Sequence, residues 1–295
     1  MKKILTTLIA AIISLTATVS AQKLTSNVGT VPDAYNFWLY TPDPVDQEIE
    51  PKPVVVFLHG ASLCGNNLDK VRRYGTIDAI EKGRKLDAYV IAPQNPGGSW
   101  NPRKVMNIVD WVSDNHNVDY DRIYVIGMSL GGYGTIDMVA TYPDQIAAAI
   151  AMCGGGTVKN LDALNDVPLW IVHGTADRAV SINESDKVVS AMKRADSSTP
   201  RLVYNRVPGM NHGQPARLFY LQESYDWLFS HTLKDSERSV SETFDLQGGI
   251  LRTAYSDLKR SGRSHRSSVS AARKSSKSKA SASAKKKSSR KKRRS

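Results

Sequence analysis

Residues 122–134 read Arg-Ile-Tyr-Val-Ile-Gly-Met-Ser-Leu-Gly-Gly-Tyr-Gly, and they are the strongest indication of how this chain folds. The pattern Gly-x-Ser-x-Gly at 127–131 lies between an apolar run that predicts a buried strand and a segment to Ala140 that predicts a helix. In that context the strained turn leaves room only for small neighbours and exposes the serine hydroxyl at the strand end. We therefore predict Ser129 as a nucleophile; the alternative is a glycine-rich turn with a structural serine.

A nucleophilic serine requires a base, and the base requires an acid that orients it. Downstream of Ser129, the apolar runs at 167–172 and 201–207 predict two further strands. Asp177 follows the first run and His212 follows the second, so both side chains are expected on loops at strand ends. Serine, acid and histidine occur in one of the orders known for catalytic triads. We predict Asp177 as the orienting acid and His212 as the general base.

Other interpretations of these polar residues stay open. Asp177 is also placed to cap a short helix predicted from Ser181, and His212 is also consistent with an ordinary loop histidine. His173 lies at a strand end before the acid, and we interpret it as packing or hydrogen-bonding support. Spacing indicates no partner for the remaining histidines, His59, His116, His231 and His265.

The apolar run at 53–58 predicts a central parallel strand, because such strands are buried on both faces. It ends in His59-Gly60-Ala61, and a glycine after a strand permits backbone conformations that other residues avoid. The following amide is then free to face a substrate. We predict the backbone N–H groups of Ala61 and Leu130 as the two donors for a developing oxyanion. A plain strand-to-loop turn at 59–60 is the alternative.

Taken together, these stretches resemble the α/β-hydrolase superfamily. Within it they are similar to secreted single-domain esterases grouped with feruloyl and acetylxylan esterases, polyhydroxybutyrate-depolymerase-like proteins and prolyl-oligopeptidase-like predicted peptidases. The resemblance implies a mostly parallel central sheet with helices on both faces and minimal or no cap, and the alternation of apolar runs with helical stretches favours the same α/β architecture. The matching stretches span about residues 35–232 and are 56–60, 90–94 with Trp100, 119–134, 151–155, 173–177 and His212.

The chain departs from the pattern of these families at two positions. Leu130 stands where a methionine is common, which leaves the chemistry intact because the backbone N–H acts there. Residues 213–215, Gly-Gln-Pro, follow His212 where a tryptophan-bearing segment is common, and this departure is expected to reshape the pocket beside the base.

The surroundings of the predicted triad give a weaker indication of the substrate. The gaps between its members hold no long inserted cap, which favours a bulky or polymer-linked ester over a small buried lipid. In the loop 93–102, Trp100 is either a pocket wall that stacks on a sugar or aryl group or a side chain packed beneath the loop. The sequence shows no metal-binding pattern, and we expect neither a metal nor a cofactor.

The N-terminal residues predict the cellular location of the protein. Residues 1–3 are Met-Lys-Lys, 4–19 are apolar, and 19–21 are Val-Ser-Ala, which together are typical of a secretory signal peptide over 1–21. An anchoring helix is the alternative, although the run is shorter than the ~20 residues a span needs. We expect a secreted or periplasmic protein without a transmembrane anchor. Cys64 and Cys153 are then either bridged or two free thiols, and the sequence leaves this open.

The C-terminus has a different composition. Residues 251–295 hold 17 Lys and Arg and one acid, a net charge of +16, whereas 22–250 hold 21 bases and 27 acids. We expect a disordered tail over 261–295 that is either merely solvated or contacts an anionic surface, with no specific nucleic acid as partner. The catalytic domain is expected over 22–235, followed at 236–260 by an extension whose packing the sequence does not predict.

These residues predict a serine hydrolase that cleaves carboxylic esters through an acyl-enzyme. The resemblance implies feruloyl or acetyl esters on polysaccharide as the substrate class. A peptidase of prolyl-oligopeptidase type is one alternative, but no N-terminal propeller precedes the domain to select small peptides. A catalytically degenerate binding protein, held on polyanions by the tail, is the other.

Overall fold

The structure is a computed structural model that describes residues 23–42, 50–240, 246 and 249–258. The described residues up to Asp257 form one compact unit. The predicted signal peptide at 1–21 and the predicted disordered tail at 261–295 lie outside the described residues. Within the described part, no helix combines the length and the apolar character needed to span a bilayer.

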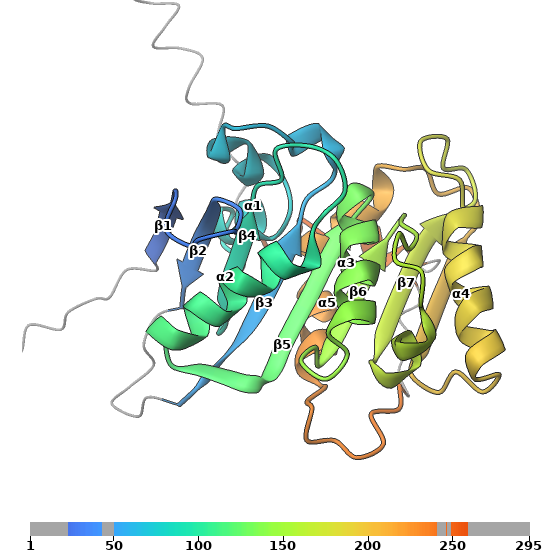
Figure 1. The fold of residues 1–295 in the computed structure, drawn as a ribbon. Helices are drawn as coiled ribbons and strands as arrows, with labels where there is room; N and C mark the ends of the chain where they lie inside the picture. Colours follow the sequence, from blue (N-terminus) through green and yellow to red (C-terminus); the bar gives the residue numbers. More distant parts are fainter. Residues whose placement is uncertain (1–22, 43–49, 241–245, 247–248, 259–295) are drawn as a thin grey trace, which may run out of the picture. The chain divides into compact units, whose positions relative to one another are not determined.

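An eight-stranded sheet in the order β1-β2-β4-β3-β5-β6-β7-β8 forms the centre of this unit (Figure 1). From β4 onward all neighbours pair in parallel, while β1 and β2 add an antiparallel edge. The prediction of a mostly parallel sheet is confirmed. The strands are β1 (Lys23–Asn27), β2 (Phe37–Thr41), β3 (Lys52–Leu58), β4 (Tyr89–Pro93), β5 (Val118–Met128), β6 (Ala148–Met152), β7 (Leu169–Gly174) and β8 (Leu202–Val207).

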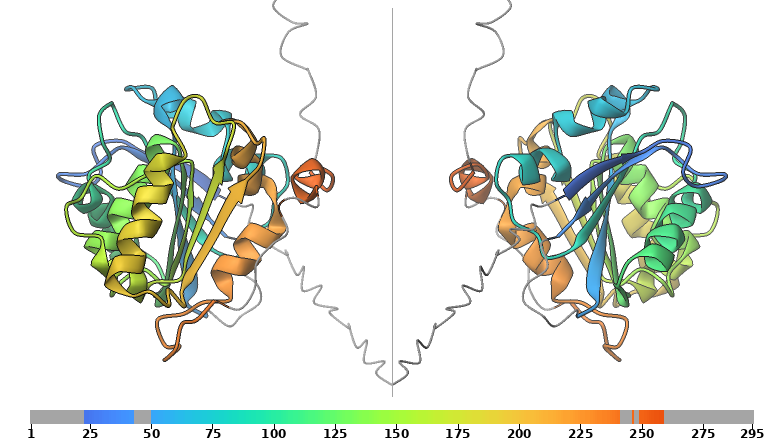
Figure 2. Two further views of the ribbon diagram at one scale, coloured as in Figure 1. Left: turned by 90° about the vertical axis from the view of Figure 1, so that its right-hand side faces the viewer. Right: turned by 90° about the vertical axis from the view of Figure 1, so that its left-hand side faces the viewer.

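Helices cover both faces of the sheet, as predicted. α2, α3 and α4 lie on one face, and α1 and α5 lie on the other (Figure 2). The α-helices are α1 (Thr76–Glu81), α2 (Pro102–Asn115), α3 (Leu130–Thr141), α4 (Asn183–Ala195), α5 (Gln222–Phe229) and α6 (Ile250–Thr253). Short 3₁₀ turns lie between them, namely η1 (Ala61–Leu63), η2 (Leu68–Arg73), η3 (Asp162–Asp166) and η4 (Gln214–Tyr220).

The two covered faces explain why β3 is apolar at nearly every position. Val54 and Val56 belong to the core beneath α2 and α3. Phe57 points to the other face and packs edge-on against Phe219, with ring centroids 5.0 Å apart. All three side chains are fully buried. Burial of each such side chain stabilises the fold by roughly 1.5–3 kcal/mol. β3 therefore cannot hold polar residues at every second position, as a strand with one exposed face does.

The sequence of α2 shows how a covering helix is specified. Asn101 caps its N-terminus by accepting hydrogen bonds from the N–H groups of Arg103 at 3.0 Å and Lys104 at 3.3 Å, and Pro102 occupies the first turn. Its buried face then recurs every three to four residues, with Val105, Ile108, Val109 and Val112 against the sheet. The exposed face carries the polar residues.

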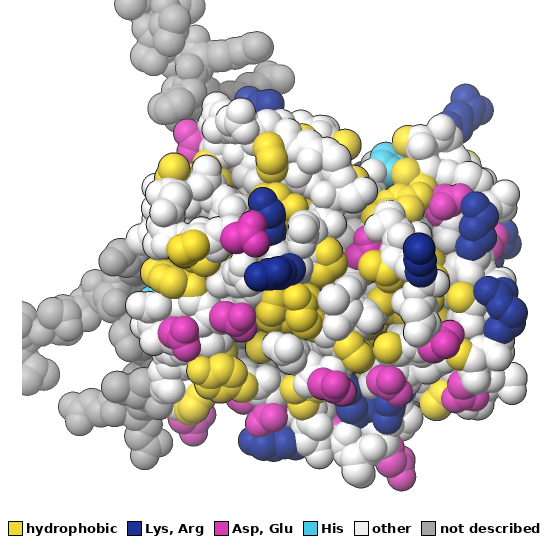
Figure 3. All heavy atoms as spheres, in the orientation of Figure 1, with side chains coloured by type: hydrophobic (Ala, Val, Ile, Leu, Met, Phe, Trp, Pro, Cys, Tyr) yellow, Lys and Arg dark blue, Asp and Glu magenta, His cyan; other side chains and the backbone are white. Residues whose placement is uncertain are grey.

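Surface charge on this unit is mixed. Acidic and basic side chains are interspersed among apolar and neutral ones on the face drawn in Figure 3. This agrees with the small excess of acids over bases in residues 22–250, and it places the strongly basic character of the chain in its C-terminal residues.

The C-terminal extension packs on the domain where it is described. The buried Arg84 guanidinium binds the Asp257 carboxylate, with an N–O distance of 2.6 Å. Tyr255 contacts the ring of Tyr220 with centroids 4.6 Å apart, and Leu251 is buried. Described residues beyond 235 therefore pack in the same compact unit as the sheet.

The turn between β5 and α3 is closed by backbone contacts that exclude side chains. A Cβ atom added to Gly131 would lie 1.9 Å from the carbonyl oxygen of Leu58 on β3. One added to Gly127 would lie 2.3 Å from the carbonyl oxygen of Gly131. Small residues at these positions let the helix start directly against the neighbouring strand.

Substitution of Gly131 by alanine is therefore expected to destabilise the fold by about 1–3 kcal/mol or more, because the methyl group meets backbone that cannot move aside. Urea unfolding followed by circular dichroism measures the change. Gly213→Ala is the matched control, since its nearest atom is 3.8 Å away and its φ of −81° suits alanine. Equal stability of the two variants would contradict the close packing of the turn.

Neither cysteine forms a disulfide. Cys64 is half-buried and Cys153 is fully buried at the end of β6. Ellman's reagent without reductant should therefore titrate Cys64 slowly in native protein and both thiols in guanidinium chloride. Failure to detect any thiol in denaturant would show that the two residues are bridged.

Candidate active site

Ser129 occupies a strained turn at the centre of the sheet. Its φ of 59° and ψ of −121° lie in a region that costs non-glycine residues about 1–3 kcal/mol. Its N–H donates to the carbonyl of Met152 on β6 at 2.8 Å, and its carbonyl accepts from Tyr133 N–H at 3.0 Å. The backbone is thus fixed from both sides, and the hydroxyl is presented at the carboxyl end of β5.

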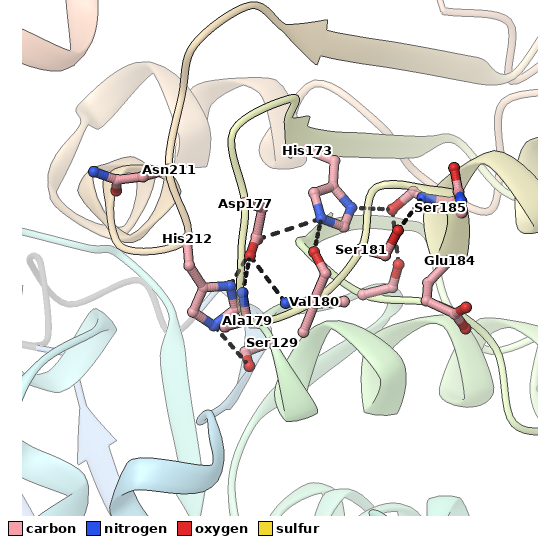
Figure 4. A network of polar contacts seen from close by, with 12 residues as sticks. Ser129, His173, Asp177, Ala179, Val180, Ser181, Glu184, Ser185, Asn211 and His212 are labelled. Atoms are coloured by element: carbon pink, nitrogen blue, oxygen red, sulfur yellow. Dashed lines mark hydrogen bonds and ion pairs between the residues drawn. The ribbon is translucent and has the colours of Figure 1, made fainter.

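The three side chains predicted as a triad come together at this edge (Figure 4). His212 Nε2 lies 3.0 Å from Ser129 Oγ, and His212 Nδ1 lies 2.7 Å from Asp177 Oδ2. Because the carboxylate only accepts, Nδ1–H donates to it and leaves Nε2 to accept from the serine hydroxyl. The His212 side chain is 27% exposed while Asp177 is fully buried, so the site is open on the side of the base.

The topology explains how residues distant in sequence meet here. Ser129 follows β5, Asp177 follows β7 and His212 follows β8, and parallel strands end at the same edge of a sheet. Between Ser129 and His212 the chain forms only α3, β6, η3, β7, α4 and β8 with their loops. This fully described stretch contains no separate cap.

Hydrogen bonds hold Asp177 as a carboxylate. Burial alone raises its pKa, but donation from Val180 N–H, from the His212 ring and from Ala179 N–H outweighs burial and keeps the pKa below its ordinary value. Both backbone N–H groups lie 2.9 Å from Oδ1. Asp177 does not cap α4, which begins at Asn183 without a side-chain cap; its Oδ2 contacts the His212 ring instead.

His173 contacts the acid, and its hydrogen bonds agree with the packing or hydrogen-bonding support expected of it. Its Nε2 lies 3.1 Å from the carbonyl of Val180 and 3.3 Å from Asp177 Oδ2, so this nitrogen carries the proton. Its Nδ1 lies 2.8 Å from Ser185 Oγ and accepts the hydroxyl proton, while Ser185 Oγ also lies 2.7 Å from the carbonyl oxygen of Gly154. Burial lowers the pKa of His173. Sequence reasoning missed Ser185, because nothing in its spacing points from α4 back to the acid.

Cys153, His173 and Asp177 are the group that offers metal-ligand atoms here, all within 4.8 Å of one another. A metal requires the thiolate. Burial and the neighbouring Asp177 carboxylate instead raise the pKa of the Cys153 thiol, so the sulfur keeps its proton. Both His173 nitrogens already contact protein partners. This donor set does not suit a resident ion, and the absence of a metal remains a prediction.

The residues predicted to hold an oxyanion flank Ser129. Leu130 is the first residue of α3, and Ala61 starts η1 directly after Gly60. A Cβ atom on Gly60 would lie 3.4 Å from Ser129 Cβ, which places this turn beside the nucleophile. Among the described residues, neither the Ala61 nor the Leu130 N–H has a hydrogen-bond partner.

His59 positions the Gly60 turn as an uncharged ring. Burial lowers its pKa to about 4. Its Nε2 accepts from Asn95 N–H at 3.1 Å, so Nδ1 donates to Gly60 O at 2.8 Å. The Gly60 N–H donates to Tyr74 Oη at 2.8 Å. These contacts fix the turn without placing a charge near the site.

Of the two alternatives for Trp100, its position agrees with packing beneath the loop and not with a substrate-stacking wall. Its side chain is only 3% exposed and packs against His59 and Tyr35, with ring centroids 4.9 Å and 5.2 Å away. Its Nε1 donates to the carbonyl of His59 at 3.3 Å. Gly134 allows this packing, because a Cβ there would lie 2.7 Å from the indole. Trp100 therefore packs against the turn at 59–60 and holds it in place.

Comparison with known proteins gives the same fold. Residues 100–217 match the profile of the dienelactone hydrolase family. Poly(3-hydroxyalkanoate) depolymerase C of Paucimonas lemoignei is 30% identical over 149 residues, which are 44% of this chain and 34% of that protein. Acetylxylan esterase A of Emericella nidulans is 28% identical over 153 residues, 44% of this chain and 45% of that protein.

The chain thus spans less than half the length of these two curated relatives. Among solved structures, that of a thermostable esterase superposes with a TM-score of 0.59 at 26% identity, over 71% of this chain and 63% of that one. The sheet order, the strand–turn–helix at Ser129 and these similarities agree, and the chain has the α/β-hydrolase fold.

Proposed function

We propose that this protein is a serine hydrolase of carboxylic esters. The observation that supports this most is the continuous chain of hydrogen bonds from Ser129 Oγ through the His212 ring to Asp177, with distances of 3.0 Å and 2.7 Å. The backbone N–H groups of Ala61 and Leu130, which have no partner among the described residues, start the two segments beside Ser129 and are the proposed oxyanion donors. A nucleophile, a base, an orienting acid and two oxyanion donors are the groups that acyl transfer requires.

In the proposed reaction Ser129 Oγ attacks the ester carbonyl while His212 Nε2 takes its proton. The Asp177 carboxylate stabilises the imidazolium that forms, and the N–H groups of Ala61 and Leu130 bind the tetrahedral oxyanion. The C–O bond to the alcohol then breaks, and the alcohol leaves with the proton from His212. Water repeats the sequence, releasing the acid and restoring the serine.

The substrate class that we propose is an acetyl or feruloyl ester on a polysaccharide. Support comes from the similarity to acetylxylan esterase A and from the partial exposure of the His212 side chain. The N-terminal pattern over 1–21 supports secretion or export to the periplasm, where such polymers are met. The basic C-terminal tail is proposed to contact an anionic surface there.

Hydrolysis of p-nitrophenyl acetate and methyl ferulate tests the proposal. Ser129→Ala should lower kcat by at least about a thousand-fold, because the residual groups cannot form an acyl-enzyme. Ser197→Ala, on the exposed loop after α4, is the matched control and should retain full activity. Activity that survives in the Ser129 variant would disprove the assigned nucleophile. A folded wild-type protein inactive on both esters but active on peptide substrates would favour the peptidase alternative.

The support from His173 gives a second prediction. His173→Phe keeps the ring volume but removes the donor to Asp177 and the partner of Ser185, so kcat should fall about ten- to hundred-fold with KM little changed. His173→Gln, which retains an N–H donor, should recover part of that loss. Equal rates for both variants and wild type would show that His173 only fills space.

A further inference from the structure

The C-terminal segment, residues 249–257, packs beside the elements that surround the candidate active site. It contains α6, which lies on the face of the sheet that carries α1 and α5 (Figure 2). Its contacts are with η4, which begins two residues after His212. The ring of Tyr255 lies 4.6 Å from that of Tyr220 at the end of η4, and the Leu251 carbonyl accepts from the arginine of η4 at 3.4 Å. The C-terminal segment therefore rests on the turn that follows the base.

Arg84 joins the C-terminal segment to the same residue of η4. Its side chain is only 5% exposed. The guanidinium donates to the carbonyl of Tyr220 and to both carboxylate oxygens of Asp257, at 2.6 Å and 3.0 Å. Hydrogen bonds from Arg84 keep the pKa of Asp257 below its ordinary value, so the pair is charged at neutral pH. A bidentate pair of this kind fixes orientation as well as distance.

The hydroxyl of Tyr220 connects η4 to the loop before α1. Tyr220 Oη accepts from Gly75 N–H at 3.2 Å and donates to Asp78 Oδ2 at 2.6 Å. Burial and the Asp78 carboxylate raise the pKa of Tyr220, so the hydroxyl keeps the proton that it donates. Gly75 has a φ of 97°, and a Cβ atom there would lie 2.1 Å from the Phe57 ring. The backbone at Gly75 is thus held between an aromatic ring and a hydrogen bond.

Tyr74 directly precedes Gly75 and reaches the predicted oxyanion turn. Its Oη accepts from Gly60 N–H at 2.8 Å. A Cβ atom on Gly60 would lie 2.9 Å from Tyr74 Oη and 3.4 Å from Ser129 Cβ, so the phenol hydroxyl and the nucleophile lie against the same glycine. Ala61, whose N–H is a proposed oxyanion donor, follows that glycine. A shift of the backbone at 74–75 therefore changes the direction of the Ala61 N–H.

We propose that the C-terminal segment positions the oxyanion turn through Tyr220, which acts as a positioning residue for ester hydrolysis. The segment fixes Tyr220, the Tyr220 hydroxyl fixes Gly75, and the adjacent Tyr74 fixes Gly60. The inference rests on the proposed function. The oxyanion exists only in the transition state, so a loosened turn lowers kcat and leaves KM nearly unchanged.

Two variants of the full-length protein test the proposal. Tyr220→Phe keeps the ring and removes the hydroxyl that holds Gly75, and Asp257→Asn weakens the pair with Arg84. We measure kcat and KM for p-nitrophenyl acetate, Tm, and the affinity for phenylboronic acid by calorimetry. The boronate forms a tetrahedral adduct on a nucleophilic serine, so it reports the oxyanion site without turnover.

The chain offers a matched control for each variant. Tyr124 is a fully buried tyrosine whose hydroxyl also accepts once and donates once, from Arg122 Nε at 3.3 Å and to the His231 carbonyl at 2.7 Å. Tyr124→Phe therefore removes a comparable pair of hydrogen bonds away from the site. Asp87 is 58% exposed and pairs with a lysine at 2.8 Å, while Asp257 is 56% exposed, so Asp87→Asn matches Asp257→Asn.

We expect Tyr220→Phe to lower kcat about five- to twenty-fold and to weaken boronate binding by a similar factor, with KM within about two-fold of wild type. Asp257→Asn should lower kcat about two- to five-fold. The double variant should be no slower than Tyr220→Phe alone, because both changes act through one residue. Both controls should keep the kcat and boronate affinity of wild type even where Tm falls.

Unchanged kcat and boronate affinity in Tyr220→Phe would overturn the proposal. So would a loss no larger than that of Tyr124→Phe at an equal fall in Tm, or full additivity of the two changes in the double variant. A folded wild type that neither hydrolyses esters nor binds boronate overturns the proposed function as well. An active wild type beside unaffected variants overturns only the role of the C-terminal segment.

Discussion

The close approach of α3 to β3 is the constraint on which the rest of the structure depends. The backbone of Gly131 rests against the carbonyl of Leu58, and this contact sets how sharply the chain turns at Ser129. This turn then determines where the Ser129 hydroxyl meets His212 and which way the Leu130 N–H faces. The strain at Ser129 is compensated by the paired strands on both sides of β5, whose burial supplies far more free energy than the turn costs.

The buried histidines around this turn are uncharged, and their ring nitrogens have hydrogen-bond partners. His59 and His173 are both buried, and each has its two ring nitrogens engaged with backbone or hydroxyl partners. The charge of the site is thereby concentrated on Asp177, which is compensated by N–H donors rather than by a cation. A carboxylate held in this way keeps a fixed orientation, because each hydrogen bond constrains a different direction.

The positions that were predictable from the sequence are those set by local pattern and strand order. The placement of Ser129, Asp177 and His212 at one edge followed from three apolar runs and the polar residues after them. The sequence could not decide between the two alternatives for Trp100, because its burial depends on Tyr35 and Gly134, which come from distant parts of the chain. The role of Ser185 was likewise not predictable, because Ser185 lies on α4 and its partner His173 lies on β7.

The order of the strands also distributes rigidity unevenly over the site. Ser129 follows β5, which is paired on both sides, whereas His212 follows β8, the last strand of the sheet, which is paired on one side only. Hydrogen bonds at an outer strand open in smaller cooperative units than those at the centre. On warming, the base should therefore separate from the nucleophile through local opening of β8 while the central strands stay protected from hydrogen exchange. Activity would then be lost through local opening of β8 below the temperature of global unfolding. It would return on cooling, because the central strands never unfolded.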